Sequence, residues 1–191
     1  LGGAFGGKER GATIWACMAA LAAFLTKRPV LVKLTRAEDM HYTGKRHPFT
    51  SLWQVGYDEN GKILAYDILL LANGGAYADL SVAILERAMF HSDNAYFIPD
   101  IRIRGYACKT NLPPNTAFRG FGAPQGIFVM ESILDKIARQ LKIDPLEIRK
   151  RNAYQNGQLT PYGQEITHSQ LNNIYTKLAE KANYSMLKEE V

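Results

Sequence analysis

Cysteine is scarce in this sequence, and no cysteine lies in a metal-binding pattern. Only Cys17 and Cys108 occur among 191 residues, far apart and without a C-x-x-C pair. Because zinc sites and iron–sulfur clusters need several closely spaced thiolates, neither is predicted within this chain. Two isolated cysteines favour a reducing compartment, and we expect both to be unpaired and to act as small apolar side chains.

The sequence also lacks an apolar run that could cross a membrane. Its most apolar stretch, residues 12–24, is shorter than the roughly 20 residues of a spanning helix and is expected to form a buried core helix. No basic segment with a following apolar stretch and cleavage site stands at the start. We therefore expect a cytoplasmic protein that does not bind membranes. The first residue is Leu1 rather than methionine, which suggests a piece of a longer chain.

Dense charge of one sign is missing as well. The net charge of +5 is spread along the chain, and its densest basic cluster, residues 149–151, is too short for a nucleic-acid-binding tract. The four histidines show no metal-ligand spacing. These absences argue against nucleic acid as a partner, and they leave small anionic ligands or an acidic partner surface as the easier interpretation.

The apolar content of 47% is ordinary for a globular protein, and the length is sufficient for a core without disulfides. Apolar periodicity predicts helices at residues 11–27, 80–90, 125–141, 145–152 and about 171–178. Alternating or apolar runs predict strands at residues 30–34, 49–57, 63–71 and 101–110, with an Asn-Gly hairpin turn between the second and the third.

Strands and helices do not alternate regularly along the chain. The predicted fold class is therefore α+β, with mixed sheets and packed helices, rather than a doubly wound parallel sheet. We interpret residues 1–191 as a single fragment, with an α+β core at 1–141 and a helical and loop extension at 142–191.

Glycine is concentrated in two stretches, of which the first is Gly2–Glu9. Taken alone, its sequence GGAFGGKE resembles a loop that cradles a phosphate. A Walker loop, however, needs serine or threonine after its lysine, and here Glu9 follows Lys8. A tight connection packed under the following helix is the alternative interpretation of this stretch.

The second stretch, Asn115–Pro124, has the sequence NTAFRGFGAP and precedes the helix predicted at 125–141. Its glycines allow close approach of the backbone to a ligand, Phe121 offers a flat apolar face, and Arg119 offers five fixed donors. Such a loop can hold a planar, polar ligand. The alternative is a tight turn with two core phenylalanines and a solvated arginine.

Read together, the two stretches resemble the molybdenum hydroxylases, the xanthine dehydrogenase and aldehyde oxidase family. Gly2–Glu9, then Glu86-Arg87-Ala88, then Asn115–Gly122 occur in the order and spacing of that family. The residues 46–49 and 109–111 extend the resemblance to nearly the whole chain. It is closest to the xanthine dehydrogenase branch, and it implies the first part of the large molybdenum-cofactor-binding domain.

The resemblance implies an oxidoreductase whose cofactor is molybdenum held by molybdopterin, alone or in its dinucleotide form. In that family a molybdenum-bound hydroxide attacks an electron-poor carbon, so water supplies the oxygen. Electrons leave through 2Fe-2S clusters to FAD, which lie on other domains or subunits. The implied partners are therefore those iron–sulfur and FAD parts, a purine substrate and, in the full assembly, a second copy of the protein.

The resemblance also implies roles for individual residues. Phe5, Gly6, Ala117 and Arg119 would line the cofactor, with the main chain of Phe5 and of Arg119 nearest the molybdenum and no side chain ligating it. Phe121 would stack on the flat heterocyclic substrate, an arrangement worth about 1 kcal/mol beyond area burial.

Two further positions, Glu9 and Arg87, are the expected catalytic and substrate-binding residues. By the resemblance, Glu9 would hydrogen-bond the purine ring, and Arg87 would face the carbonyl oxygen on which negative charge develops. Relatives that oxidise aldehydes usually carry apolar residues at both positions, so a purine such as hypoxanthine or xanthine is favoured. The alternatives are a first-turn acid at Glu9 and, for Arg87, a surface salt bridge with Glu86 or Asp79.

The family's general-base glutamate would lie beyond Val191, and a glutamine that contacts the molybdenum oxo group would lie before Leu1. The fragment alone is therefore expected to be inactive. Two other functions stay open: oxidation of an aldehyde or of another nitrogen heterocycle, and a non-enzymatic glycine-loop domain that binds a nucleotide or phosphate. A structural interaction domain without a small ligand is a third class of explanation.

Overall fold

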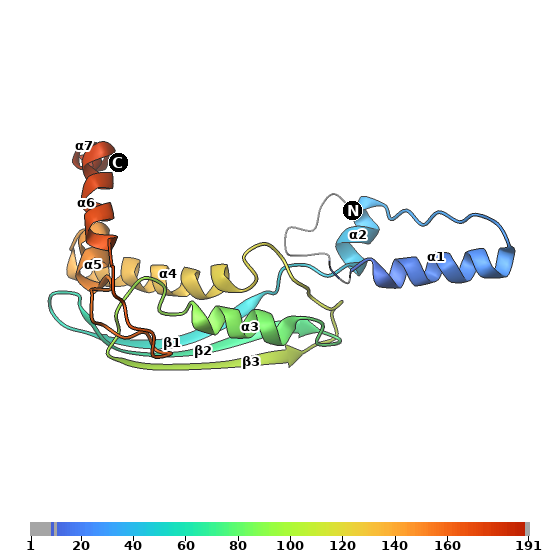
Figure 1. Cartoon of the computed structure of the whole chain (residues 1–191), viewed down its shortest axis with the longest axis horizontal. Coiled ribbons are helices and arrows are strands. Elements are labelled where there is room, and N and C mark those ends of the chain that lie inside the picture. The colour runs from blue at the N-terminus through green and yellow to red at the C-terminus, as the bar shows by residue number, and fades with distance from the viewer. Residues whose placement is uncertain (1–8, 10, 190–191) are drawn as a thin grey trace. The chain divides into compact units, whose positions relative to one another are not determined.

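The computed structural model describes residue 9 and residues 11–189, and within them it confirms the α+β fold (Figure 1). The helices are α1 (Thr13–Thr26), α2 (Arg36–Tyr42), α3 (Ser81–Phe90), α4 (Ala123–Leu141), α5 (Pro145–Asn152), α6 (Leu171–Lys181) and α7 (Tyr184–Glu189). The strands are β1 (Phe49–Tyr57), β2 (Ile63–Gly75) and β3 (Asp100–Lys109), and they form one sheet in the order β1-β2-β3.

Contacts within the chain divide it into two compact units. The first unit consists of the residues up to Ser51 together with Leu70–Met89 and Arg104–Gln125. The second unit consists of Leu52–Leu69, Phe90–Ile103 and the residues from Gly126 onward. The sequence-based division at residue 141 stays a prediction.

Strands β1 and β2 form the predicted hairpin. In the turn between them, Asp58 Oδ1 accepts hydrogen bonds from the backbone N–H groups of Asn60 and Lys62, both at 2.9 Å. Gly61 has a φ of 79°, a conformation that glycine adopts without the strain of a Cβ atom. The Asn-Gly signal in the sequence therefore identified the turn correctly.

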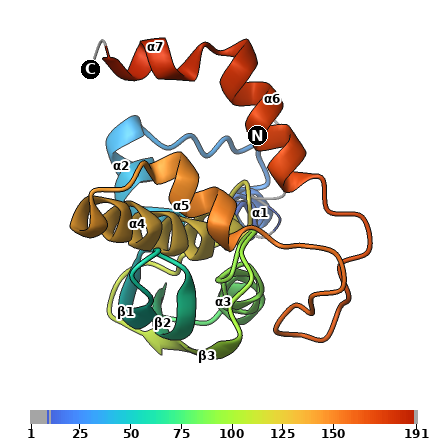
Figure 2. The ribbon, with the colours of Figure 1, turned by 90° about the vertical axis from the view of Figure 1, so that its left-hand side faces the viewer.

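The core of the second unit lies where α4 crosses one face of the sheet (Figure 2). Met130, Ile133, Leu134 and Ile137, four of the residues in the apolar stripe predicted for α4, are buried. They share the core with buried side chains from β2 and α5, namely Ile63, Tyr66, Ile68 and Ile148. Burial of each large apolar side chain stabilises the fold by roughly 1.5–3 kcal/mol.

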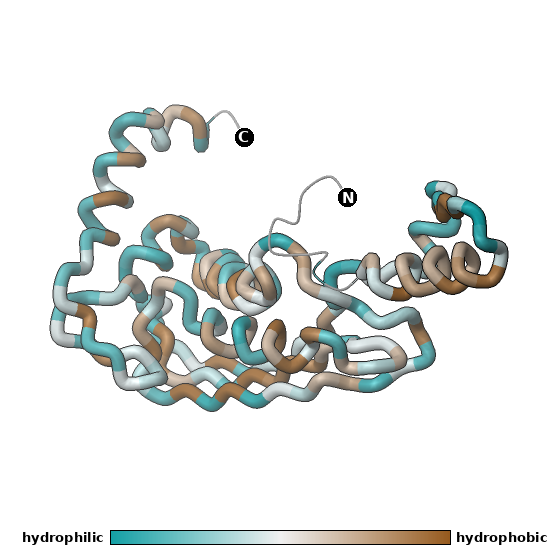
Figure 3. Tube along the Cα trace, turned by 45° about the vertical axis from the view of Figure 1, so that its right-hand side comes forward, coloured by the Kyte–Doolittle hydropathy of each residue, from teal (hydrophilic) through white to brown (hydrophobic). Residues whose placement is uncertain are grey.

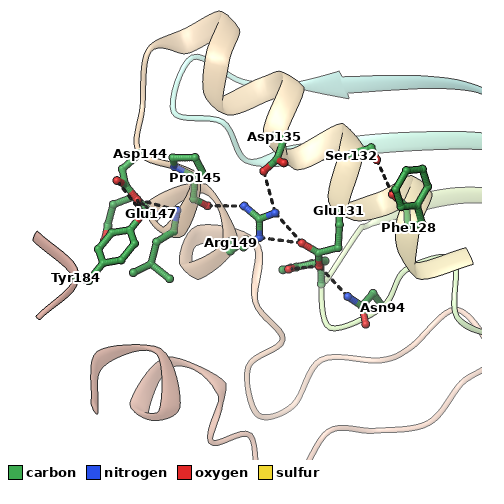
Figure 4. A network of polar contacts seen from close by, with 12 residues as sticks. Asn94, Phe128, Glu131, Ser132, Asp135, Asp144, Pro145, Glu147, Arg149 and Tyr184 are labelled. Carbon is green, nitrogen blue, oxygen red and sulfur yellow. Dashed lines mark hydrogen bonds and ion pairs between the residues drawn. The ribbon is translucent and has the colours of Figure 1, made fainter. Parts of the chain in front are cut away.

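A network of polar contacts ties α5 to α4 in the second unit (Figure 4). Arg149 donates from Nε to Glu131 Oε2 at 2.8 Å and from Nη2 to Asp135 Oδ1 at 2.9 Å. Glu131 Oε1 also accepts from Asn94 Nδ2 at 2.8 Å and from Tyr96 Oη at 2.6 Å. The Glu131 carboxylate is thus shared by three donors, which fixes the side of α4 that faces α5.

Helix α5 has the bounds predicted for it, residues 145–152, and an Asp-Pro pair marks its start. Asp144 is the N-cap, and its Oδ1 accepts from the backbone N–H of Leu146 at 2.7 Å. Pro145 occupies the first helical position, where a missing N–H costs nothing. Lys188 Nζ, on α7, donates to Asp144 Oδ2 at 2.5 Å.

Several local predictions were wrong. Helix α1 contains no buried residue, although its sequence is apolar nearly all round (Figure 3). The strand predicted at residues 30–34 is absent, and these residues are irregular. Strand β2 continues to Gly75, beyond the predicted end at residue 71. Among the described residues, no helix is both long and apolar enough to cross a bilayer.

Helices α2 and α7 were not predicted. Helix α2 begins with a capping box that the sequence does display: Thr35 and Glu38 bond to each other's backbone N–H. The T-x-x-E spacing was therefore an available signal for a helix start.

Cys17 and Cys108 are both free, and Cys17 is exposed rather than buried.

Candidate functional site

The loop Asn115–Pro124 lies in the first unit and is anchored at its beginning. Asn115 is buried, donates from its backbone N–H to Gly74 O at 3.1 Å, and donates from Nδ2 to Asn73 O at 2.9 Å. Thr116 Oγ1 then donates to Asp79 Oδ2 at 2.6 Å. These bonds fix the loop to the end of β2 and to the segment before α3.

Three consecutive residues of the loop have positive φ. The values are 90° for Gly120, 50° for Phe121 and 101° for Gly122. A left-handed conformation at a non-glycine residue costs about 1–2 kcal/mol, so Phe121 is held there by its surroundings. One holding contact is the hydrogen bond from the Phe121 N–H to Phe118 O at 2.8 Å.

Gly122 brings this loop directly against helix α3. A Cβ atom at Gly122 would lie 2.0 Å from Ile84 O and 3.0 Å from Ala88 N, closer than any side chain tolerates. Only glycine allows this approach of two backbones. The loop that carries Phe121 is therefore packed on the helix that carries Arg87.

The predicted loop residues differ in exposure. Ala117 is buried, Phe118 and Arg119 are exposed, and Phe121 is half-buried. Among the residues that the structure describes, no hydrogen bond is made by the backbone N–H groups of residues 117–120. A run of unpaired N–H groups next to an exposed arginine is suited to acceptor atoms of a ligand.

Arg87 lies in the last turn of α3 and is exposed. Within the described part of the chain it forms no ion pair with Glu86 or with Asp79, so the salt-bridge alternative is not seen. Glu9 is exposed and precedes α1, and it is not part of that helix's first turn. Phe5 and Gly6, the other predicted cofactor contacts, lie outside the described residues.

Arg46, for which no role was predicted, contacts the same loop. Arg46 Nη2 donates to Arg119 O at 2.6 Å, and its guanidinium lies 4.5 Å from the centre of the Phe118 ring. Its Nη1 atom is buried and has no hydrogen-bond partner among the described residues. The match of residues 46–49 to the family pattern was the available signal for this position.

His47 lies in the irregular segment before β1, and its side chain is buried. Its Nε2 lies 2.7 Å from Ser81 Oγ, the first residue of α3. Burial lowers the pKa of His47, and the nearby charge of Asp79 opposes that shift in part. Gln125 Nε2 donates to His47 O at 3.3 Å, which ties the start of α4 to the same segment.

The first unit also has a cavity of about 90 Å³, which Trp15, Tyr77, Asp79 and Thr116 help to line. None of the predicted site residues lines it. In the described part of the chain, no group of three or more histidine, cysteine, aspartate or glutamate side chains is placed to hold a metal ion.

Comparison with known proteins matches this chain to one family. The profile described as "Molybdopterin cofactor-binding domain" matches residues 1–153. The chain is 44% identical to the xanthine dehydrogenase of Dictyostelium discoideum over 96% of its own length, and 44% identical to the nicotinate hydroxylase of Emericella nidulans over all of it. It spans 14% of the length of each of these proteins.

Solved structures resemble the chain in three dimensions. The aldehyde oxidoreductase from Desulfovibrio gigas superposes with a TM-score of 0.79 at 34% identity, covering 90% of this chain and 19% of that protein. The resemblance noted in the glycine-rich stretches is thus confirmed by two independent comparisons.

Proposed function

The chain belongs to the molybdopterin cofactor-binding domain family, and from this premise we propose that it helps to form the molybdenum site of a hydroxylase that oxidises a purine. The observation that carries the proposal is the packing of Gly122 on α3, which brings the Phe121 loop beside the helix of Arg87. The loop, with its main-chain donors and its aromatic ring, thus packs on the helix of Arg87, an arginine for which the described part of the chain provides no ion pair.

The residues of the loop fit a molybdopterin group. Its phosphate and pterin carry many acceptor atoms, and the loop offers the N–H groups of residues 117–120, for which the described part of the chain provides no acceptor. Ala117 and Arg119 would meet the cofactor through main-chain atoms, together with Phe5 and Gly6. When bound, the molybdenum centre supplies the hydroxylating oxygen and accepts the electrons of the substrate.

Three side chains of this chain would bind and orient the substrate. Phe121 would stack on the heterocycle and exclude water from one of its faces. Glu9 would accept or donate a hydrogen bond at the ring, which orients the carbon to be oxidised. Arg87 would stabilise the negative charge that develops on the substrate's carbonyl oxygen, and it is free to do so because no described residue neutralises it.

Relatives of the chain are named for different substrates, namely xanthine, nicotinate and aldehydes. Glu9 and Arg87 favour the purine, because a simple aldehyde has neither a ring group that Glu9 could hydrogen-bond nor a second oxygen that Arg87 could face. Oxidation of another nitrogen heterocycle is the nearest competing activity, since nicotinate is also a planar, nitrogen-containing ring.

The whole protein is proposed to pass electrons to 2Fe-2S clusters and FAD on other domains or subunits. We further propose a dimeric assembly, a cytoplasmic location and a general-base glutamate outside residues 1–191. The test is to purify the full-length protein from its host, measure molybdenum per protomer, and compare oxidation of xanthine, nicotinate and an aromatic aldehyde. Stoichiometric molybdenum with xanthine as the best substrate is the expected result, whereas absence of molybdenum would contradict the proposal.

A further inference from the structure

Arg46 is placed at the loop by its neighbours in the sequence. The backbone N–H of Thr116 donates to Lys45 O at 3.0 Å, and Gln125 Nε2 donates to His47 O on the other side. Gly44 approaches Pro114 so closely that a Cβ atom there would lie 2.4 Å from Pro114 O. The segment 44–47 therefore runs along the loop and holds it both before and after residues 117–122.

From this placement we propose that Arg46 is a positioning residue, which fixes the main chain at Phe118–Gly120 in the conformation that meets the cofactor. The proposal rests on the proposed function, because that function makes these main-chain groups ligand contacts. Arg46 itself is not proposed to touch the substrate.

The hydrogen bond from Arg46 to Arg119 O sets the direction of a peptide unit. In a trans peptide the C=O and the following N–H point in opposite directions, and the described chain contains no cis peptide. Because Arg46 holds the Arg119 carbonyl toward segment 44–47, the Gly120 N–H points away from that segment. One unpaired N–H of the loop is thus oriented by a side chain 73 residues earlier in the sequence.

The second contact is the guanidinium over the Phe118 ring. Phe118 is about half exposed, so the cation–π contact limits the motion of a ring that the core does not hold. A lysine could keep the charge, but it has neither the planar face nor the paired donors with which arginine makes both contacts at once. The arrangement therefore specifies arginine, and replacement by lysine is a discriminating test.

The experiment uses the full-length protein with Arg46→Met, Arg46→Lys and a control, Arg36→Met. Arg36 is a largely exposed arginine of the same unit, and its ion pair with Asp39 lies outside the loop. Hydrogen exchange of the amides at residues 117–121 is measured with and without cofactor, together with kcat and KM for xanthine. Of these amides only the Phe121 N–H is hydrogen-bonded within the described part of the chain, to Phe118 O. We expect its exchange to be roughly ten- to a hundredfold faster in Arg46→Met, less accelerated in Arg46→Lys and unchanged in Arg36→Met.

In the enzyme with bound cofactor, Arg46→Met is expected to lower kcat at least about tenfold, with a smaller effect on KM. The reason is that a small displacement of a main-chain group disturbs the alignment of the reacting groups more than it weakens substrate binding. Unchanged exchange in Arg46→Met would overturn the proposal, and so would equal acceleration throughout the first unit. If Arg46→Met does not fold, Arg46→Lys decides: faster exchange confined to residues 117–121 supports the proposal, and wild-type exchange overturns it. A wild-type protein without molybdenum would refute the proposed function, while the exchange comparison would still decide the role of Arg46.

Discussion

Arg149 Nε lies 2.8 Å from Glu131 Oε2, and this contact joins α5 to α4 through partly buried charges. Removing one member of such a pair leaves the other without its partner in a region of low dielectric constant. The carboxylates of Glu131 and Asp135 would both lose their cation in Arg149→Met.

We therefore expect Arg149→Met to destabilise the protein by about 2 kcal/mol, between the values typical of exposed and of fully buried pairs. The measurement is thermal or urea unfolding of the full-length protein. Lys150→Met is the matched control, because within the described part of the chain Lys150 pairs only with Glu147 one turn away, at 3.1 Å. Its effect should stay below about 0.5 kcal/mol. Equal losses in the two variants would mean that the α4–α5 network contributes little.

Arg87→Met should damage purine oxidation far more than oxidation of an aromatic aldehyde. A purine gathers negative charge on a ring oxygen as hydroxide attacks, and a cation there stabilises that state more than the bound substrate. Loss of one well-placed electrostatic contact costs roughly 10²–10³ in rate. Glu9→Val should act in the same direction, because it removes a hydrogen-bond partner of the ring.

The measurement is kcat/KM for both substrates in wild type and the two variants, normalised to molybdenum content. Glu86→Gln serves as a control, since it alters an exposed charge beside Arg87 on the same helix. An equal decline for both substrates would show that these residues hold the cofactor or the fold. No decline for either would refute the assignment of the substrate.

Gly122→Ala should disrupt the loop, because its Cβ atom would meet the Ile84 carbonyl at 2.0 Å. The backbone of the loop must then move away from α3, and we expect loss of more than about 3 kcal/mol in stability or at least tenfold less bound molybdenum. Gly157→Ala is the matched control. Gly157 also has a positive φ, of 83°, but a Cβ atom there would contact nothing within 4 Å.

The control variant should cost only about 1 kcal/mol, the strain of a left-handed alanine. The difference between the two variants isolates the close approach of the loop to α3. The measurements are the molybdenum content and the free energy of unfolding of the two full-length variants. Equal losses in both would mean that Gly122 is needed only for its backbone angle and not for the close approach to α3.

His47 should make the protein less stable in mildly acidic solution. Its pKa is lowered in the folded state, mainly by burial, so the unfolded chain takes up a proton first as the pH falls below about 6.5. Above that pH both states are neutral at this residue and no penalty exists. Destabilisation should therefore begin near pH 6.5 and grow until the folded-state pKa is reached.

His47→Gln should remove this component, since glutamine keeps a polar group near Ser81 but does not titrate. The measurement is the thermal midpoint at pH 7.5 and at pH 5.5 in wild type, in His47→Gln and in His168→Gln, whose histidine is exposed. A smaller difference between the two pH values is expected in His47→Gln alone. The same difference in all three proteins would show that other groups cause the acid sensitivity.

Much of the local structure could be predicted from the sequence because its signals are local. The Asn60-Gly61 turn, the Asp144-Pro145 helix start and the apolar stripe of α4 each depend on residues a few positions apart, and the structure confirms all three. Glycines in the loop at 115–124 likewise indicated unusual backbone angles, which Gly120 and Gly122 adopt.

Predictions that depended on distant partners failed or stayed open. Helix α1 is apolar enough for a core but is not buried, and residues 30–34 have the composition of a strand without pairing as one. The intrinsic propensity of a segment indicates which secondary structure it favours. Whether the segment is buried or paired in a sheet depends on which other parts of the chain pack against it. The roles proposed for Glu9 and Arg87 depend on a ligand in the same way.

The sequence by itself determined the family and the α+β class, because motif residues and periodic patterns are properties of neighbouring positions. Only the tertiary structure decided that Gly122 packs on α3, the helix that carries Arg87, that His47 is buried against Ser81, and that Arg46 holds the Arg119 carbonyl. Each of these contacts joins residues at least 34 positions apart. Such pairs meet only when the whole chain has closed the intervening loops and buried its apolar surface, and no local pattern records which pairs will meet.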